Sequence, residues 1–167
     1  MGKLIALSLM LLSVVVLQGC SSAQAIKPED VVVGNTIPEF SVKSLEGKTI
    51  DKASLKGQTV VLNFWASWCT PCMSEIPELK ELAANSKAKV VGIALDENGL
   101  ETVKPFVDKH QINYTVAVGT QDMFAQFNGV GIPYTLVLDP SQHIVKIYRG
   151  PTNRESLEAD LKTIQAQ

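Results

Sequence analysis

Two cysteines, Cys69 and Cys72, are the residues of this chain whose type and spacing are best suited to chemistry, and they lie in the stretch FWASWCTPCMSEIP. A thiolate is a nucleophile, and a second thiol one helical turn away can attack the mixed disulfide that the first has formed. The spacing therefore predicts a redox-active dithiol in which Cys69 is the exposed nucleophile and Cys72 is the sheltered resolving cysteine.

An apolar run precedes the two cysteines and an amphipathic pattern follows them. Residues 59–66 (TVVLNFWA) are almost continuously apolar and rich in β-branched and aromatic side chains, which predicts a fully buried central strand. Residues 72–84 carry apolar side chains at helical spacing, and Pro77 predicts a kink in that helix. Cys69 therefore lies at a helix N-terminus, where the unpaired N–H groups and the helix dipole favour a thiolate.

The rest of the chain continues the alternation of strands and helices. Short strands near residues 40–42 and 49–50, with a turn at Gly47, predict a hairpin. Further strands are expected at 88–96, 114–118, 134–139 and 144–150, and helices at 101–110, 121–128 and 154–165. This order predicts an α/β fold with a mixed central sheet flanked by helices and an N-terminal β-hairpin extension. The cysteines then lie at the carboxyl end of a central strand, where open α/β sheets carry their chemistry.

The first residues, MGKLIALSLMLLSVVVLQGCSS, have the pattern of an export signal. The apolar stretch from Leu4 to Leu17 is short for a membrane span and suits the core of a signal peptide. The LQGC that ends it resembles a bacterial lipobox, which implies lipidation of Cys20 and anchoring by acyl chains. A plain secretory signal cleaved near Ala23 or Ala25 is the alternative. Both interpretations predict that the remaining chain is exported.

The expected domain organisation follows from this pattern. Residues 1–19 are a signal peptide, residues 20–34 a lipidated N-terminus with a polar linker, and residues 35–167 a single folded domain. The net charge of −2, with no basic run, gives no reason to expect a nucleic-acid partner.

Three other interpretations of the cysteine pair are disfavoured. A zinc site would need two more ligands, and the sequence offers His110 and His143 without a second cysteine pair or a histidine pair at ligand spacing. A structural disulfide across so short a loop would add little stability. A coincidental strand-to-helix corner fits poorly with an exported chain that retains only these two cysteines after Cys20.

Three segments of the chain resemble the TlpA/ResA-type thiol-disulfide oxidoreductases, which have a thioredoxin fold and are grouped with the redoxin and AhpC-TSA-like proteins. VVLNFWASWCTPCMSEIPEL is similar to their active-site signature, FSVKSLEGKTI to their N-terminal hairpin, and GVGIPYTLVLD to their cis-proline segment. The resemblance extends from about Ile37 to the end of the chain. It implies that residues 35–167 are a thioredoxin-like domain with protein-disulfide oxidoreductase activity.

The resemblance also assigns catalytic roles to individual residues. Cys69 matches the nucleophile and Cys72 the resolving cysteine, and the two form the redox-active disulfide. Glu75 matches an acidic residue that influences cysteine titration in the ResA-like subgroup. A carboxylate near the dithiol could accept a proton from Cys72 or raise a thiol pKa by repulsion. The alternative for Glu75 is a first-turn acid that suits the helix dipole.

The substrate-binding residues expected from the resemblance are Trp68, Thr70, Pro71, Ile132 and Pro133. Pro133 matches the cis-proline that faces the dithiol, and Ile132 would offer its backbone to an extended partner segment. A simple strand-start proline is the alternative for Pro133. Trp65 fits the core as well as the contact surface.

Two positions depart from related proteins. Asn63 stands where thioredoxins have a buried Asp, and because Asn cannot relay a proton, Glu75 or water would have to assist proton transfer. Tyr134 replaces the Thr that often follows the cis-proline, and we expect it to alter the groove beside the dithiol.

The resemblance implies an envelope reductase of protein disulfides that keeps selected cysteines reduced, such as those awaiting haem in cytochrome c maturation. Its partners would be protein thiols and disulfides, a membrane thiol transporter as electron donor, and the membrane itself through the lipid anchor. No cofactor and no metal are expected. Ser21, in place of the Asp that commonly retains lipoproteins in the inner membrane, favours a periplasm-facing lipoprotein of the outer membrane.

Two rival functions stay open at this point. A peroxiredoxin-like thiol peroxidase would require Pro-x-x-x-Thr-x-x-Cys, and neither Cys69 nor Cys72 is preceded by that arrangement. A non-enzymatic metallochaperone would hold copper(I) between the two cysteines, with Met73 and Met123 as the available thioether ligands.

Overall fold

The computed structural model describes residues 27–166 and contains every strand and helix that the sequence pattern predicts. The expected signal peptide, Cys20 and Ser21 lie outside the described residues. Two short elements were not expected: a 3₁₀ helix at Pro28–Asp30 and α1 at Lys52–Leu55. The other elements are β1 (Ser41–Lys43), β2 (Thr49–Asp51), β3 (Val60–Trp65), α2 (Thr70–Asn85), β4 (Lys89–Ala94), α3 (Leu100–His110), β5 (Thr115–Val118), α4 (Gln121–Gln126), β6 (Tyr134–Leu138), β7 (Ile144–Arg149) and α5 (Arg154–Gln165).

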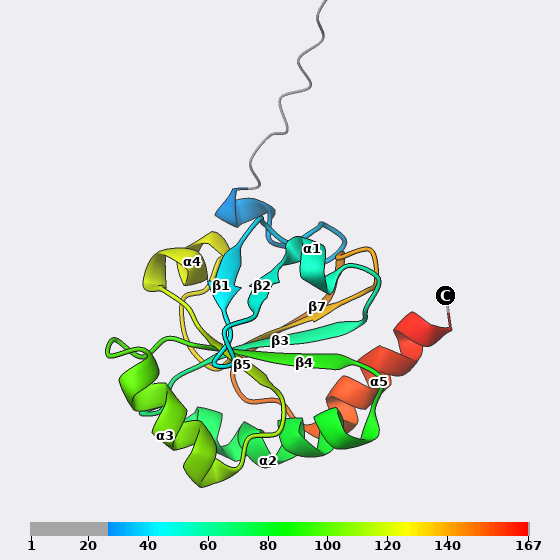
Figure 1. Cartoon of the computed structure of the whole chain (residues 1–167). Helices are drawn as coiled ribbons and strands as arrows, with labels where there is room; N and C mark the ends of the chain where they lie inside the picture. Colours follow the sequence, from blue (N-terminus) through cyan, green and yellow to red (C-terminus); the bar gives the residue numbers. More distant parts are fainter. Residues whose placement is uncertain (1–26, 167) are drawn as a thin grey trace, which may run out of the picture.

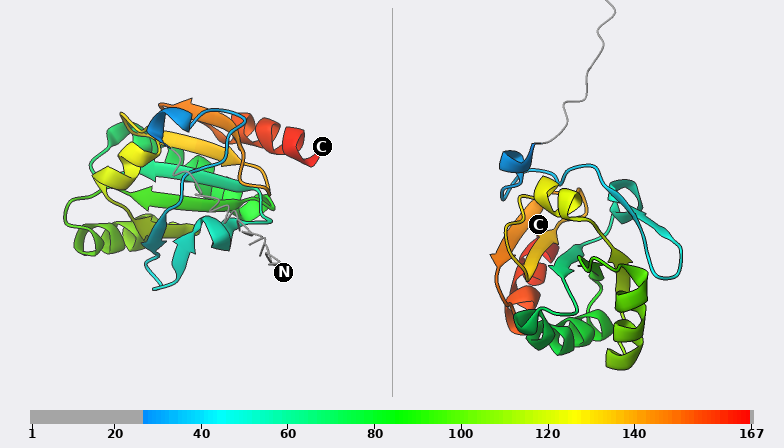
Figure 2. Two further views of the ribbon diagram at one scale, coloured as in Figure 1. Left: turned by 90° about the horizontal axis from the view of Figure 1, so that it is seen from above. Right: turned by 90° about the vertical axis from the view of Figure 1, so that its left-hand side faces the viewer.

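Five strands form a mixed sheet in the order β5-β4-β3-β6-β7 (Figure 1). β3, β4 and β5 run parallel, whereas β6 is antiparallel to β3 and β7 is antiparallel to β6. β3 is the central strand and is buried at all six of its positions. Helices or loops cover both faces of the sheet, which is why this strand is continuously apolar and not alternating. Figure 2 shows the strands side by side from above.

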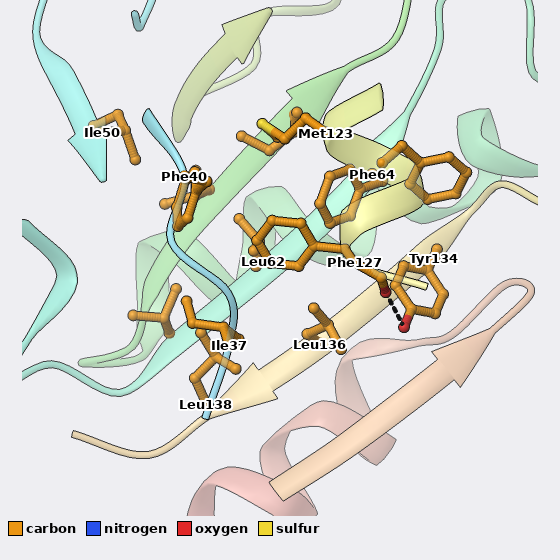
Figure 3. Close-up of a cluster of buried hydrophobic side chains, with 14 of the residues drawn as sticks. Ile37, Phe40, Ile50, Leu62, Phe64, Met123, Phe127, Tyr134, Leu136 and Leu138 are labelled. Atoms are coloured by element: carbon orange, nitrogen blue, oxygen red, sulfur yellow. Dashed lines mark hydrogen bonds between the residues drawn. The ribbon is translucent and has the colours of Figure 1, made fainter. Parts of the chain in front are cut away.

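Alternate side chains of β3 enter two different hydrophobic layers. Leu62 and Phe64 point into the layer beneath the N-terminal segment, the hairpin and α4, which Figure 3 shows in close-up. Val61 and Trp65 point into the opposite layer, which α2, α3 and α5 cover. The cysteines belong to this second layer, so the helix that carries them also packs on the sheet.

The N-terminal hairpin predicted from the sequence is present as a separate two-stranded sheet, β1-β2. It is joined to the edge of the main sheet, because the backbone N–H of Leu45 donates to the carbonyl oxygen of Val116 at 2.9 Å. Val31, inside the segment expected to be a linker, is fully buried in the first hydrophobic layer.

The helix α2 extends past Pro77 to Asn85 as one element. Pro77 has no N–H group to donate to the carbonyl oxygen of Met73, which is the physical basis for the predicted kink. Among the described residues, the helices are all too short or too polar to cross a membrane.

Candidate active site

Cys69 and Cys72 form a disulfide at the junction of β3 and α2, and their Cα atoms are 5.3 Å apart. Cys69 is the N-cap residue of α2, and its Sγ accepts a hydrogen bond from the backbone N–H of Cys72 at 3.2 Å. The sulfur of Cys69 is therefore held among the free N–H groups of a helix N-terminus. That position stabilises a thiolate once the disulfide is reduced.

The expectation that Cys69 is the exposed cysteine is wrong for this oxidised state. Only 4% of Cys69 and 1% of Cys72 are exposed, because the two sulfurs are bonded to each other and pack in the same layer as Trp65. Trp65 is 1% exposed and belongs to the core. Next to the cysteines in the chain, Trp68 is 67% exposed and residues 70–71 are also exposed.

The segment containing Pro133 lies at the same edge of the sheet as the dithiol. Tyr134 pairs with Phe64 near the carboxyl end of β3, so the preceding residue, Pro133, lies level with the end of that strand. The Ile132–Pro133 peptide bond is cis, as predicted. Ile132 is half-buried and packs against both hydrophobic layers.

Glu75 is buried one turn after Cys72 on the same helix, with 1% of the residue exposed. Its two carboxylate oxygens have separate donors. The side-chain N–H of Asn63 donates to Oε2 at 3.2 Å, and the backbone N–H of Thr152 donates to Oε1 at 2.7 Å. The alternative of a first-turn acid that suits the helix dipole is wrong, because Glu75 lies beyond the first turn of α2 and its carboxylate is buried.

Burial raises the pKa of Glu75 to about 7, and the hydrogen bonds from Thr152 and Asn63 oppose that rise in part. A carboxyl group with a pKa near neutrality can both accept and release a proton at physiological pH. Because residues three apart in a helix lie on one face, Glu75 and Cys72 are neighbours on the buried side of α2.

Asn63 holds Glu75 to the sheet. Its side-chain nitrogen also donates to the Thr135 hydroxyl at 2.9 Å, so one amide group bridges β3, β6 and α2. An Asp at this position would place a second negative charge beside Glu75, whereas the Asn supplies a donor. Asn63, which stands where thioredoxins have an Asp, is therefore suited to bind the carboxylate of Glu75.

The expectation that Tyr134 shapes the groove beside the dithiol is wrong. Its side chain is 1% exposed and lies in the hydrophobic layer opposite the cysteines, among Phe64, Phe124 and Phe127 (Figure 3). The Tyr134 hydroxyl donates to the carbonyl oxygen of Phe127 at 3.0 Å. Alternation along β6 places it on that face, because Thr135 already faces the side of Asn63.

Sequence reasoning missed the residue that fixes the loop before Cys69. The carboxylate of Asp96 accepts hydrogen bonds from the backbone N–H and the hydroxyl of Ser67. Asp96 is 6% exposed and follows β4, the strand beside β3. The signal available in the sequence was Asp96 itself, an acidic residue at the end of the apolar stretch 88–96. A hollow of about 340 Å³ lies between Trp68 and the segment 96–98.

The structure bears on the two metal interpretations. Within residues 27–166, no three His, Cys, Asp or Glu side chains are grouped so that they could hold a metal ion. Met123 lies in the hydrophobic layer opposite the cysteines, so it cannot complete a copper site with Cys69 and Cys72. Met73 is half-buried on α2.

The fold and the site together define a class of protein: a thioredoxin-fold protein with a Cys-x-x-Cys disulfide at the N-terminus of its first long helix. Residues 33–157 match the AhpC/TSA family, and the chain belongs to this family. The thiol-disulfide oxidoreductase ResA of Bacillus anthracis is 37% identical over 139 residues, which cover 81% of this chain and 80% of that protein.

Solved structures agree with this assignment. A thiol:disulfide interchange protein of the thioredoxin family from Chlorobium tepidum TLS is 33% identical, with a TM-score of 0.68 over 78% of this chain and 95% of that chain. A secreted thiol-disulfide isomerase from Corynebacterium glutamicum is 25% identical, with a TM-score of 0.68 over 77% of this chain and 85% of the other. The chain therefore has the fold and the dithiol of a thiol-disulfide oxidoreductase.

Proposed function

We propose that this chain is a protein-disulfide oxidoreductase that acts outside the cytoplasm as a reductase. The observation that carries the proposal is the Cys69–Cys72 disulfide at the N-terminus of α2. A pair of cysteines that closes into a disulfide can deliver two electrons to a substrate disulfide, and the helix terminus favours the thiolate needed to begin. Similarity to proteins named as thiol-disulfide oxidoreductases supports the same activity.

The reaction begins from the reduced dithiol. The Cys69 thiolate attacks one sulfur of a substrate disulfide; that S–S bond breaks, and the other substrate sulfur leaves as a thiolate that takes a proton from solvent. Cys72 then loses its proton and attacks the sulfur of Cys69. The Cys69–Cys72 bond forms as the bond between Cys69 and the substrate sulfur breaks, and that sulfur leaves as a thiolate that takes up a proton. The substrate is thereby released as a dithiol, with two electrons transferred.

Glu75 is the proposed acceptor of the Cys72 proton. It lies one turn further on the same buried helical face, and its pKa of about 7 allows it to take up a proton and release it again near neutrality. Within the dithiol layer, the residues that bind Glu75 from outside α2 are the uncharged Asn63 and Thr152.

The proposed substrate-binding surface surrounds the disulfide on two sides. Trp68, Thr70 and Pro71 are exposed around it, and Ile132 and Pro133 lie at the neighbouring strand β6. An extended segment of a partner protein would lie across this surface and pair with the backbone at Ile132.

The cellular setting is part of the proposal. Residues 1–19 act as a signal peptide, Cys20 is lipidated and anchors the chain, and Ser21 favours the outer membrane. A membrane thiol transporter returns the dithiol to its reduced form, and cysteines that await haem in cytochrome c maturation are the proposed substrates. The resemblance to the TlpA/ResA-type proteins supports these assignments.

Trapping of the mixed disulfide tests the proposal. The full chain carrying Cys20→Ser, with the dithiol as its only cysteines, is reduced and mixed with a peptide whose disulfide can be cleaved. Addition of Cys72→Ser should leave the peptide covalently attached to Cys69, as measured by mass spectrometry, whereas Cys69→Ser should give no comparable adduct. Equal adducts on both variants would contradict the assignment of the nucleophile. Fast turnover of hydrogen peroxide with a recycling reductant would favour a peroxidase.

A further inference from the structure

The hollow of about 340 Å³ beside Trp68 lies at the edge of the sheet where the parallel strands end. Because β3, β4 and β5 run parallel, the segments that follow them meet at this edge. Those segments form the walls of the hollow, with residues 67–68 after β3, residues 95–98 after β4 and Gln121 after β5. Trp68 directly precedes Cys69, so the hollow begins one residue from the dithiol.

Hydrogen bonds between the segments hold these walls together. The backbone N–H of Leu95 donates to the carbonyl oxygen of Trp65 at 2.9 Å. The backbone N–H of Ser67 donates to the two carboxylate oxygens of Asp96, at 3.2 Å and 3.1 Å. The segment before Cys69 is therefore joined to the segment after β4, and the hollow between them is already formed in the protein, as binding sites usually are.

The two charged residues in the lining of this hollow are both acidic. Asp96 is 6% exposed and Glu97 is exposed, and within residues 27–166 no Lys, Arg or His belongs to the lining. Ser67 donates hydrogen bonds to Asp96 but brings it no positive charge. Buried charges are usually paired with an opposite charge, so the hollow would stabilise a positively charged group that enters it.

The surroundings of the hollow strengthen its negative charge. The N-termini of α3 and α4 lie at the same edge, and a helix N-terminus carries about half a positive charge. Glu101 and Asp122 lie in the first turns of these two helices, and each brings a full negative charge. Lys104, further along α3, pairs with Asp108 at 3.7 Å.

The lining fits an organic cation better than a metal ion. Within residues 27–166, no three His, Cys, Asp or Glu side chains are grouped so that they could hold a metal. Trp68, which is 67% exposed, offers a large aromatic ring in the wall of the hollow. A guanidinium group stacks on aromatic rings and binds carboxylates, and an ammonium group makes the same two contacts less specifically.

We propose that this hollow binds an arginine or lysine side chain of the protein substrate, with Glu97 and Trp68 as the residues that determine the preference. The inference rests on the proposed function and names the substrate class of the same dithiol: protein segments that carry a basic residue close to the cysteine. An extended segment advances about 3.3 Å per residue. A basic side chain one to three residues from the cysteine bonded to Cys69 can therefore reach the hollow beside Trp68.

The test measures how a basic residue in the substrate changes the rate of reduction. Each peptide has one cysteine, bonded to mercaptoethanol as a mixed disulfide, and a variable residue one, two or three positions before or after it. The rate constant is that for oxidation of the reduced full chain carrying Cys20→Ser. At one position or more, the Arg peptide should react about three- to tenfold faster than the Gln peptide, and the Glu peptide more slowly. The gain should disappear in about 1 M salt, where charges are screened within about 3 Å.

Variants of the chain assign this preference to the hollow. Glu97→Gln should bring the Arg-to-Gln ratio of rate constants close to one, and Glu97→Lys should invert it. Trp68→Leu, which keeps an apolar side chain and removes the aromatic ring, should lower the ratio. Glu81→Gln is the matched control, because it removes the same charge from an exposed position further along α2 and should leave the ratio unchanged.

The proposal is overturned if no position of the Arg residue gives a preference, or if Glu97→Gln keeps the ratio of the parent chain. If the parent chain reduces none of the peptides, the proposed function fails instead. Peptides with Ser in place of the cysteine then test the hollow separately, through the NMR shift of the Trp68 indole N–H. A shift with the Arg peptide and none with the Glu peptide supports the hollow as a cation site; equal shifts, or none, contradict it.

Discussion

The backbone N–H of Thr152 lies 2.7 Å from Oε1 of Glu75, although 77 residues separate the two in the chain. Two residues earlier, the N–H of Gly150 donates to the carbonyl oxygen of Pro133 at 2.9 Å. One short segment between β7 and α5 therefore binds both the helix that carries the dithiol and the proline segment beside it. Neither contact involves a side chain of the segment, so sequence patterns give no sign of it.

Replacement of Glu75 by Gln should remove a pH-dependent part of the protein's stability. The unfolded chain releases this proton near pH 4.5, whereas the folded chain holds it up to about pH 7. The stabilising contribution is therefore complete below about pH 4.5 and is lost as the pH rises to about 7. Over that window, the free energy of unfolding of the parent chain should fall by up to about 3 kcal/mol more than that of Glu75→Gln.

Urea denaturation of both oxidised chains at several pH values between 4.5 and 7.5 measures this difference. Parallel pH dependences for the two chains would show that folding does not raise the pKa of Glu75. The comparison cancels the titration of groups that the two chains share.

The bridge made by Asn63 should be worth more than an ordinary surface hydrogen bond. Asn63→Ala leaves Oε2 of Glu75 and the hydroxyl of Thr135 without their buried donor, which should cost about 1–3 kcal/mol of unfolding free energy. Asn113→Ala is the matched control, because that side chain donates to the carbonyl oxygen of Lys80 at an exposed site. Chemical denaturation should show a clearly larger loss of unfolding free energy for Asn63→Ala than for Asn113→Ala. Similar losses would show that the bridge made by Asn63 stabilises the protein no more than an exposed hydrogen bond does.

Most of the fold could be predicted from the sequence because its signals are local. The continuous apolar run of β3 and the helical spacing of apolar residues in α2 and α5 each lie within a single segment of the chain. The structure confirms these three elements. The cis bond before Pro133 was expected only from the family resemblance. The short helix α1 was not expected, since four residues are too few for a periodic pattern.

Gly92 should tolerate alanine poorly. Its added Cβ would lie 2.9 Å from Nε1 of Trp65 and 3.1 Å from the ring of Tyr114, and both side chains are buried. We expect Gly92→Ala to cost about 1–3 kcal/mol, as overpacked cores do. Gly131→Ala meets no atom within 4 Å and provides the control. Equal melting temperatures for Gly92→Ala and Gly131→Ala would show that the rings of Trp65 and Tyr114 can move aside for the added methyl group.

Asp96 should stabilise the loop that leads into Cys69. Asp96→Ala leaves the part-buried N–H of Ser67 without its acceptor, so we expect a loss of about 1–3 kcal/mol in unfolding free energy. Asp108→Ala removes a carboxylate from an exposed ion pair with Lys104 and should change stability by less than about 1 kcal/mol. Equal effects of the two substitutions would show that the Ser67–Asp96 contact is not stabilising.

The parts of the site that the sequence could not predict are those joined by tertiary contacts. Cys69, Cys72 and Glu75 lie within one helical turn or two, so spacing alone placed them together. Thr152 binds Glu75 through its backbone N–H, and the two residues are far apart in the sequence. The exposure of Cys69 was predicted wrongly because the sequence does not show that the closed disulfide is packed into the layer.

The reduction potential of the Cys69–Cys72 couple tests the proposed reductase most directly. The full chain carrying Cys20→Ser is equilibrated against dithiothreitol or glutathione redox buffers, and the fraction of disulfide is measured by thiol alkylation and mass spectrometry. The account predicts a value near that of thioredoxin, about −270 mV, at which the dithiol donates electrons. A value near about −120 mV, the potential of a dedicated disulfide-forming catalyst, would contradict it.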